Sequence, residues 1–206
     1  MGGVFNYVNL HVYHYSANNP VKYVDPDGKW VILFGITLTG GGGTAGTGET
    51  GIALSRDRDG KYQIGTYQTS GVGLYGGVGI SLNASFTFAP LAQEISNLEG
   101  YTETIGGSFS FKLFGTAGGD INIPLNGPKK NFSITLSIGI GLAPKELPGE
   151  GHMLTTLTTT NTYAEGNSLI DVWNQAVEAG LFVDFGDDII EHFKNYLNNY
   201  TGEVIP

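Results

Sequence analysis

One stretch of this chain, Val72 to Phe88, alternates between apolar residues and mostly small polar ones for 17 residues. Because successive residues of a strand point to opposite sides, the segment has one apolar face and one face of Gly, Ser, Asn and Thr, with Tyr75 among them. A typical strand has about 5–6 residues. A strand of this length must therefore coil strongly or belong to a barrel.

The same alternation returns twice, over residues 105–123 and again over residues 132–142. In the last copy, Ile134, Leu136 and Ile138 alternate with serine, threonine and glycine. Long consecutive strands with short links are typical of an antiparallel meander. We therefore predict a mainly β fold, with a long-strand meander that forms a barrel or a strongly curved sheet.

Shorter segments fill the gaps between these strands. Residues 30–38 are predicted as a buried strand, and residues 90–100 as a short helix. Residues 40–50 resemble a phosphate-binding loop, but Glu49 occupies the position of its lysine and would repel phosphate, so we interpret them as a flexible loop. The Asp-Gly pair in residues 57–60 predicts a hairpin turn.

Helical signals are concentrated near the end of the chain. Ser168, followed three residues later by Asp171, is typical of a helix N-terminus and predicts a helix over residues 168–180. A second helix is predicted over residues 187–200, where apolar residues recur at helical spacing. Both helices are amphipathic, and we expect them to cover a sheet.

Composition excludes several classes of function. The net charge is −9, with only ten Lys and Arg in 206 residues, which argues against a nucleic-acid partner. Without cysteine, the chain can form neither disulfides nor zinc–thiolate sites. The first residues lack the features of a signal peptide. We expect no metal and no cofactor.

The segment from Asn9 to Gly28, NLHVYHYSANNPVKYVDPDG, carries the most specific motif in the chain. It resembles the C-terminal boundary of the RHS-repeat-associated core, whose usual form is close to NLYxYxxNNPxxYxDPxG. The matching residues are Tyr13, Tyr15, Asn18, Asn19, Pro20, Tyr23, Asp25, Pro26 and Gly28. The resemblance covers about the first 30 residues, and His11-Val12 departs from it.

This resemblance implies a division into a boundary segment, residues 1–28, and a tip domain, residues 29–206. In the family, the tip is variable and is commonly a polymorphic toxin, secreted by a dedicated route and delivered to a competing cell. It implies an RHS shell encoded upstream and an immunity protein as partners. Some members cleave themselves near this motif, which makes Asp25 and Asp27 candidates for self-processing, although both are also ordinary turn residues.

Histidine offers one further candidate for catalysis. His152 could serve as a general base, but no activated nucleophile lies beside it in sequence. His11 and His14 fall in the boundary motif, and His192 lies in the predicted second helix. No catalytic constellation is recognisable, so the chain is not assigned as an enzyme.

Three functions remain open: an enzymatic effector tip, a membrane-active or pore-forming β-barrel, and a non-catalytic binding or structural module. Alternation cannot choose among them, because a soluble barrel and a lipid-facing barrel have the same period. The amphipathic helices and the lack of aromatic residues at both strand ends favour a soluble fold. We therefore expect the apolar face, including Leu136, to form the core.

Overall fold

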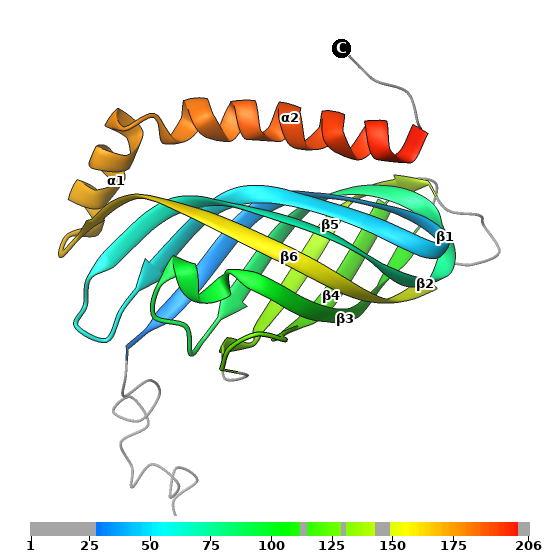
Figure 1. Ribbon diagram of the computed structural model, residues 1–206, viewed down its shortest axis with the longest axis horizontal. Coiled ribbons are helices and arrows are strands. Elements are labelled where there is room, and N and C mark those ends of the chain that lie inside the picture. Colours follow the sequence, from blue (N-terminus) through cyan, green and yellow to red (C-terminus); the bar gives the residue numbers. More distant parts are fainter. Residues whose placement is uncertain (1–27, 112–114, 129–130, 143–148, 202–206) are drawn as a thin grey trace, which may run out of the picture.

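The computed structural model describes residues 28–111, 115–128, 131–142 and 149–201 (Figure 1). Its main elements are six strands and two helices, with a short 3₁₀ helix at Ile95–Leu98. In chain order they are β1 (Trp30–Arg56), β2 (Tyr62–Ala89), β3 (Gly100–Phe111), β4 (Gly115–Pro124), β5 (Ser133–Leu142), β6 (Gly149–Gly166), α1 (Leu169–Glu178) and α2 (Leu181–Thr201).

The strands form a closed antiparallel barrel, as predicted. Their order is β1-β2-β5-β4-β3-β6, and the ring closes because β2 also pairs with β6. β3, β4 and β5 form a meander of consecutive strands, whereas the β2–β5 and β3–β6 pairs join strands that are distant in sequence. β1 is an additional strand that pairs along the whole of β2.

The hairpin of β1 and β2 folds back on itself halfway along its length. The register shifts between Gly42 and Gly43, and Gly43 has a φ of +80° that suits glycine. The two halves of β1 then lie side by side, with 3.0 Å between the Oγ1 atoms of Thr39 and Thr47. Each of these two strands therefore contributes two segments to the barrel, one on either side of the bend. The interpretation of residues 40–50 as a flexible loop is wrong, since glycine here permits a bend within a strand.

The predicted turn between the two long strands is confirmed. Lys61 N donates to Asp57 Oδ1 at 2.8 Å, and Gly60 has a φ of +85°. The short helix predicted over residues 90–100 is reduced to one 3₁₀ turn.

The helices also follow the prediction, with one difference in bounds. The α1 helix begins where expected, and Asp171 N donates to the Ser168 side chain at 3.4 Å. The α2 helix begins at Leu181, before the predicted Asp187, because Gly180 with a φ of +97° ends the first helix and lets the second start at once. In Figure 1, α1 lies at one end of the barrel and α2 runs along its wall.

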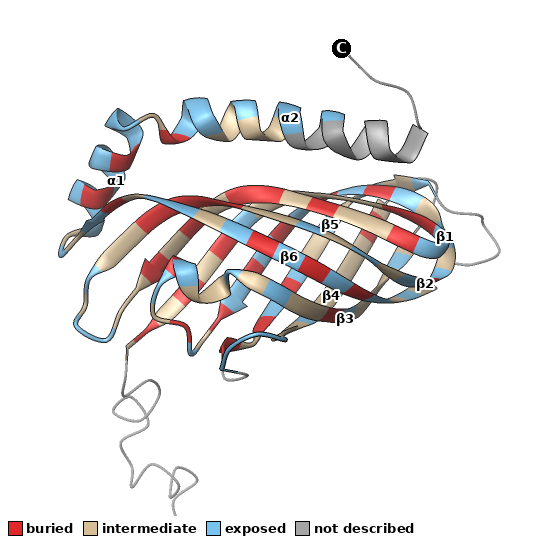
Figure 2. Cartoon of the chain, in the orientation of Figure 1, coloured by how far each residue is buried: buried red, intermediate tan, exposed pale blue. Residues whose placement is uncertain are grey.

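The expectation that the apolar face forms the core is wrong. Leu136 is 59% exposed, whereas Thr135, on the opposite face of β5, is 6% exposed. The alternation is the same whichever face points inward, so sequence period could not decide it. Figure 2 shows buried and exposed positions alternating along the strands. The barrel encloses Ser, Thr and Asn, and presents its large apolar side chains outward.

The two larger apolar clusters lie at the end of the barrel near α1, and a small one of Ala45, Tyr75 and Leu154 lies close to the bend in β1. Inside the end near α1, one cluster joins strand residues to Ala92 and Ile95 from the segment after β2. Outside it, Ile64 packs against Val172 of α1 and Leu181 of α2. The two larger clusters close one end of the barrel and hold the α1–α2 corner on its wall.

Candidate functional site

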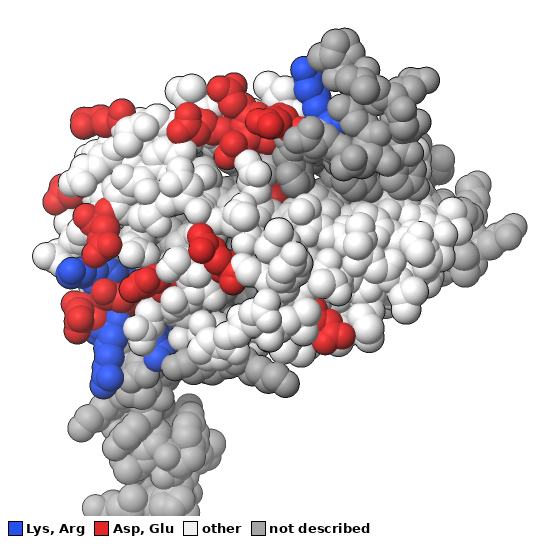
Figure 3. All heavy atoms as spheres, viewed as in Figure 1, with Lys and Arg blue, Asp and Glu red and all other residues white. Residues whose placement is uncertain are grey.

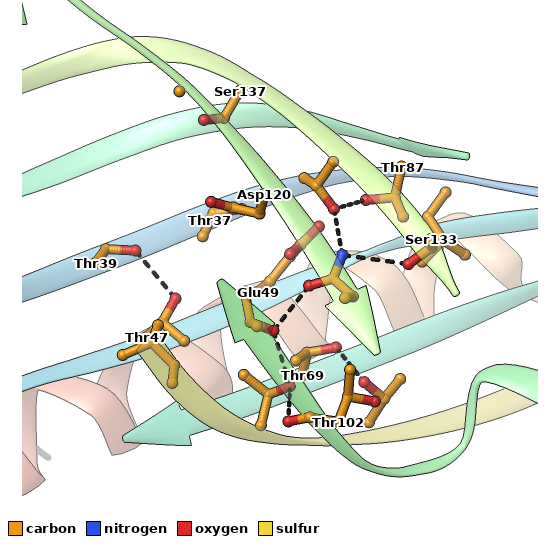
Figure 4. Close-up of a pocket in the computed structure, with 18 of the residues that line it drawn as sticks. Thr37, Thr39, Thr47, Glu49, Thr69, Thr87, Thr102, Asp120, Ser133 and Ser137 are labelled. Carbon is orange, nitrogen blue, oxygen red and sulfur yellow. Dashed lines mark hydrogen bonds between the residues drawn. The ribbon is translucent and has the colours of Figure 1, made fainter. Parts of the chain in front are cut away.

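The polar interior of the barrel is the largest concentration of chemically active groups in the described residues. It surrounds a cavity of about 100 Å³ lined by side chains from all six strands (Figure 4). Most of these side chains are Ser, Thr and Asn. Five others are Asp, Glu or His: Glu49, Asp120, Glu150 and His152 in the interior, and the exposed Glu99 at its edge.

Each interior carboxylate has a partner supplied by another strand. Glu49 Oε1 accepts hydrogen bonds from Ser85 Oγ at 2.6 Å and from the Tyr67 hydroxyl. Glu150 accepts hydrogen bonds from the hydroxyls of Tyr75 and Ser108. Hydrogen bonds to a charged acceptor are among the stronger ones in proteins.

Asp120 of β4 faces His152 of β6 across the interior. The His152 Nε2 atom lies 3.0 Å from Asp120 Oδ1, and the two side chains are 10% and 20% exposed. They form an ion pair when the imidazole is protonated. His152 Nδ1 is buried and has no hydrogen-bond partner within the described part of the chain.

Neutral side chains complete the network around these groups. Thr116 donates to Asn83 Oδ1 at 2.5 Å, and the hydroxyls of Thr87 and Thr135 lie 2.6 Å apart. The Asn122 amide donates to Ser133 at 3.2 Å and to Thr135 at 2.9 Å. Side chains that satisfy one another across strands fill the barrel, as in other narrow barrels.

The contacts of His152 bear on whether the interior contains a paired nucleophile and base. No serine or threonine hydroxyl hydrogen-bonds to His152 among the residues that the structure describes, so a nucleophile–base pair is missing there. A cavity of about 100 Å³ has room for several water molecules. The arrangement is suited to stabilising a polar lumen.

The sequence predictions for individual site residues have different outcomes. His152 lies inside the barrel, where it meets Asp120. Asp25 and Asp27 lie outside the described residues, which begin at Gly28, whose carbonyl accepts from Arg56 Nη1 at 3.3 Å. Glu49 and Glu150 were not recognised as interior groups. Their only sequence signal is a position on the small-polar face of a strand.

The outer wall is the second notable feature, and we call its exposed large side chains the apolar belt. These side chains are 40–71% exposed and come from all six strands. The belt consists of Phe34, Val72, Leu74, Val78, Ile80, Leu82, Ile105, Phe109, Ile121, Ile134, Leu136, Ile138, Ile140, Leu142 and Met153. Glu103 lies on the same outward face of β3, three residues from the start of that strand.

The lengths of the barrel strands and the distribution of charged side chains are both consistent with an apolar band around the outer wall. β3, β4 and β5 have 12, 10 and 10 residues, close to the 9–11 that a tilted strand needs to cross a bilayer. Figure 3 shows acidic side chains gathered along α2 and charges of both signs at the end of the barrel near α1, while much of the remaining wall is uncharged.

Comparison with known proteins adds no assignment: no protein-family model, curated protein or solved structure matches this chain. Within the described residues, no helix is long and apolar enough to cross a membrane. Over the same residues, no group of three or more His, Asp or Glu side chains is arranged to hold a metal ion.

Proposed function

We propose that this chain is a membrane-active β-barrel that inserts into a lipid bilayer, with the apolar belt facing the acyl chains. The observation that carries the proposal is the inverted wall, in which leucine and isoleucine point outward and serine and threonine point inward. A strand that crosses a bilayer needs this arrangement, and its backbone groups must be paired in a closed barrel.

The magnitude of the exposed apolar surface supports a lipid environment. Complete burial of one such side chain is worth about 1.5–3 kcal/mol. The fifteen side chains of the belt are about half exposed, so burying them would contribute on the order of 10–20 kcal/mol. Exposed patches of this kind mark interaction surfaces in soluble proteins.

A single inserted barrel would not act as an open pore. Its interior is filled with hydrogen-bonded side chains around a cavity of about 100 Å³, and an apolar cluster closes one end. Narrow barrels are filled by their own side chains, and only much wider ones leave an aqueous channel. The membrane activity that we propose is therefore insertion, without conduction through the barrel.

The resemblance of the first 28 residues to an RHS core boundary supports a biological setting. We propose that residues 29–206 are the tip of an RHS-type system and act on the membrane of a recipient cell, with an immunity protein as partner. Production of the chain in a bacterium should then slow growth, most clearly when the chain is directed to the compartment whose membrane it enters.

Single-cysteine labelling tests directly whether the outer wall meets lipid, because the chain has no cysteine of its own. A polarity-sensitive dye would be attached at Leu136→Cys, on the outer face, or at Arg58→Cys, in the exposed turn between β1 and β2. On addition of phospholipid vesicles, we expect a blue shift at position 136 and none at 58. Equal shifts at both positions, or none at either, would contradict the proposal.

A charge on the belt should prevent insertion without unfolding the barrel. Leu136→Asp places a carboxylate where the acyl chains would lie, and we expect its flotation with vesicles to fall at least about tenfold. Leu91→Asp is the matched control, because Leu91 is 39% exposed but lies in the connection after β2, outside the strands. Flotation of Leu136→Asp equal to that of the parent would overturn the proposal.

A further inference from the structure

The α2 helix lies along the barrel wall but carries a set of side chains that an acyl layer would reject. Asp184, Asp187, Asp188 and Glu191 fall within its first eleven residues. The helix has 21 residues, which corresponds to about 31 Å at 1.5 Å per residue. It runs along the longest dimension of the molecule (Figure 1).

Among the α2 side chains that the structure describes, that of the first residue is the most deeply buried. Leu181 is fully buried in a cluster with Val172 and Ala176 of α1 and Ile64 of β2. One turn later, the Tyr163 hydroxyl of β6 donates to Asp184 Oδ2 at 2.5 Å. Gly180, with a φ of +97°, joins this anchored corner to α1 and allows a change in direction there.

Beyond that corner, a groove separates the helix from the wall. It has a volume of about 390 Å³, and its lining includes Asp187 and Asp188 on the helix side and Thr66, Gln68 and Asn161 on the wall side. Further along β1, the outward positions Thr44, Gly46 and Gly48 border a second groove, whose lining also includes Val72, Leu74 and Leu157. The groove beside Asp187 and Asp188 is therefore lined mainly by polar residues, while the anchor of α2 is apolar.

These features conflict with an inserted barrel that keeps α2 in place. A barrel that spans the bilayer with α2 along its side would carry four carboxylates into the acyl layer, where charged groups are costly. On the wall side of the groove that α2 lines, threonine, glutamine and asparagine add no formal charge. Release of the helix would avoid the cost of bringing its carboxylates into the acyl layer.

On the basis of the proposed membrane function, we infer that α2 is a movable strap. It lies on the wall before insertion, swings away about Gly180 when the barrel enters the bilayer, and stays in water while α1 remains anchored to the barrel. The apolar corner at Leu181 holds the strap to the barrel, and the polar groove allows it to separate.

A covalent lock tests the strap. Gln68→Cys on the wall and Asp188→Cys on the helix line the same groove, and a short bis-maleimide would join them in a chain that has no other thiol. We expect flotation of the locked chain with phosphatidylcholine–phosphatidylglycerol vesicles to fall at least about tenfold. The same double variant capped with N-ethylmaleimide should float like the parent.

The matched control places the same reagent across the wall alone. Gln68→Cys and Thr159→Cys both line the groove on the barrel side, so their cross-link leaves α2 free and should not reduce flotation. A locked chain that enters vesicles as well as this control would overturn the strap. If the parent chain does not float with vesicles, the proposed membrane function is wrong. If the parent and the locked chain both float, only the strap is contradicted.

Discussion

The barrel has two flanks that differ in what covers them. The bare flank, made by β5, β4, β3 and residues 72–89 of β2, carries most of the apolar belt. The covered flank, made by the second half of β1, residues 62–68 of β2 and the last residues of β6, lies beneath α1 and α2. The outward residues of the bare flank include Ile138 and Leu136, whereas those of the covered flank include Gly46 and Gly48.

The difference shows that outward side chains are small where helices cover the barrel wall and large where no helix covers it. Glycine and threonine leave room for a helix to approach the wall, and the large residues of the bare flank leave none. A soluble barrel with two helices on one side would need a polar surface elsewhere, yet the bare flank is apolar. The contrast between the flanks therefore points to two different surroundings for one barrel.

The largest effect is expected where the covered flank depends on close backbone approach. A Cβ atom at Gly51 would lie 2.6 Å from the Gly35 Cα atom and would also collide with the Phe34 carbonyl oxygen. Gly51→Val should therefore force the two halves of β1 apart and cost roughly 3–5 kcal/mol, as severe core changes do.

Denaturation in detergent micelles would measure this loss, and Gly119→Ala is its counterpart on the bare flank. The added Cβ atom there meets nothing closer than 3.7 Å, so the change should stay within about 1 kcal/mol. Equal stabilities for the two variants would show that the halves of β1 do not pack as described.

A medium effect is expected from shortening one leucine on each flank. Leu181 is fully buried at the α1–α2 corner, whereas Leu136 is 59% exposed on the bare flank. Leu181→Ala should cost about 2–4 kcal/mol because it leaves a cavity, and Leu136→Ala should cost less than about 1 kcal/mol in solution. The opposite order in thermal unfolding would place the core on the outer wall.

The smallest effect is expected at the start of the anchored helix. Ser168→Ala removes the side chain that accepts the Asp171 N–H, and loss of such a cap costs about 1 kcal/mol. Asn167→Ala, one residue earlier, is exposed and should change unfolding by no more than a few tenths of a kcal/mol. If the two variants unfold alike, α1 does not depend on its cap.

Much of this fold follows from short-range patterns in the sequence. Alternation over residues 72–88 and 132–142 predicts long strands, the Asp-Gly pair before Lys61 predicts the hairpin, and Ser168 predicts the start of α1. Each of these signals is read within a few residues, so tertiary contacts are not needed to interpret them.

Two properties could not be read from the sequence in this way. Which face of each strand points into the barrel depends on whether the outer wall meets water or lipid. The alternation of apolar and polar residues has the same period in both cases. The interior site depends on contacts between distant strands, such as His152 of β6 with Asp120 of β4. The prediction of a loop over residues 40–50 is wrong for another reason, because glycine is compatible with both a loop and a sharply bent strand.

The folded hairpin also sets an order of assembly. A turn of a few residues at Asp57–Gly60 brings β1 and β2 together along their whole length. The two halves of β1 and the two halves of β2 can therefore pair through contacts that begin close together in sequence. The final β2–β6 seam joins Tyr62 to Gly166, and closing so long a loop carries the largest entropy cost. The β1–β2 hairpin should therefore pair and bend early in folding, and the pairing of β2 with β6 should form last.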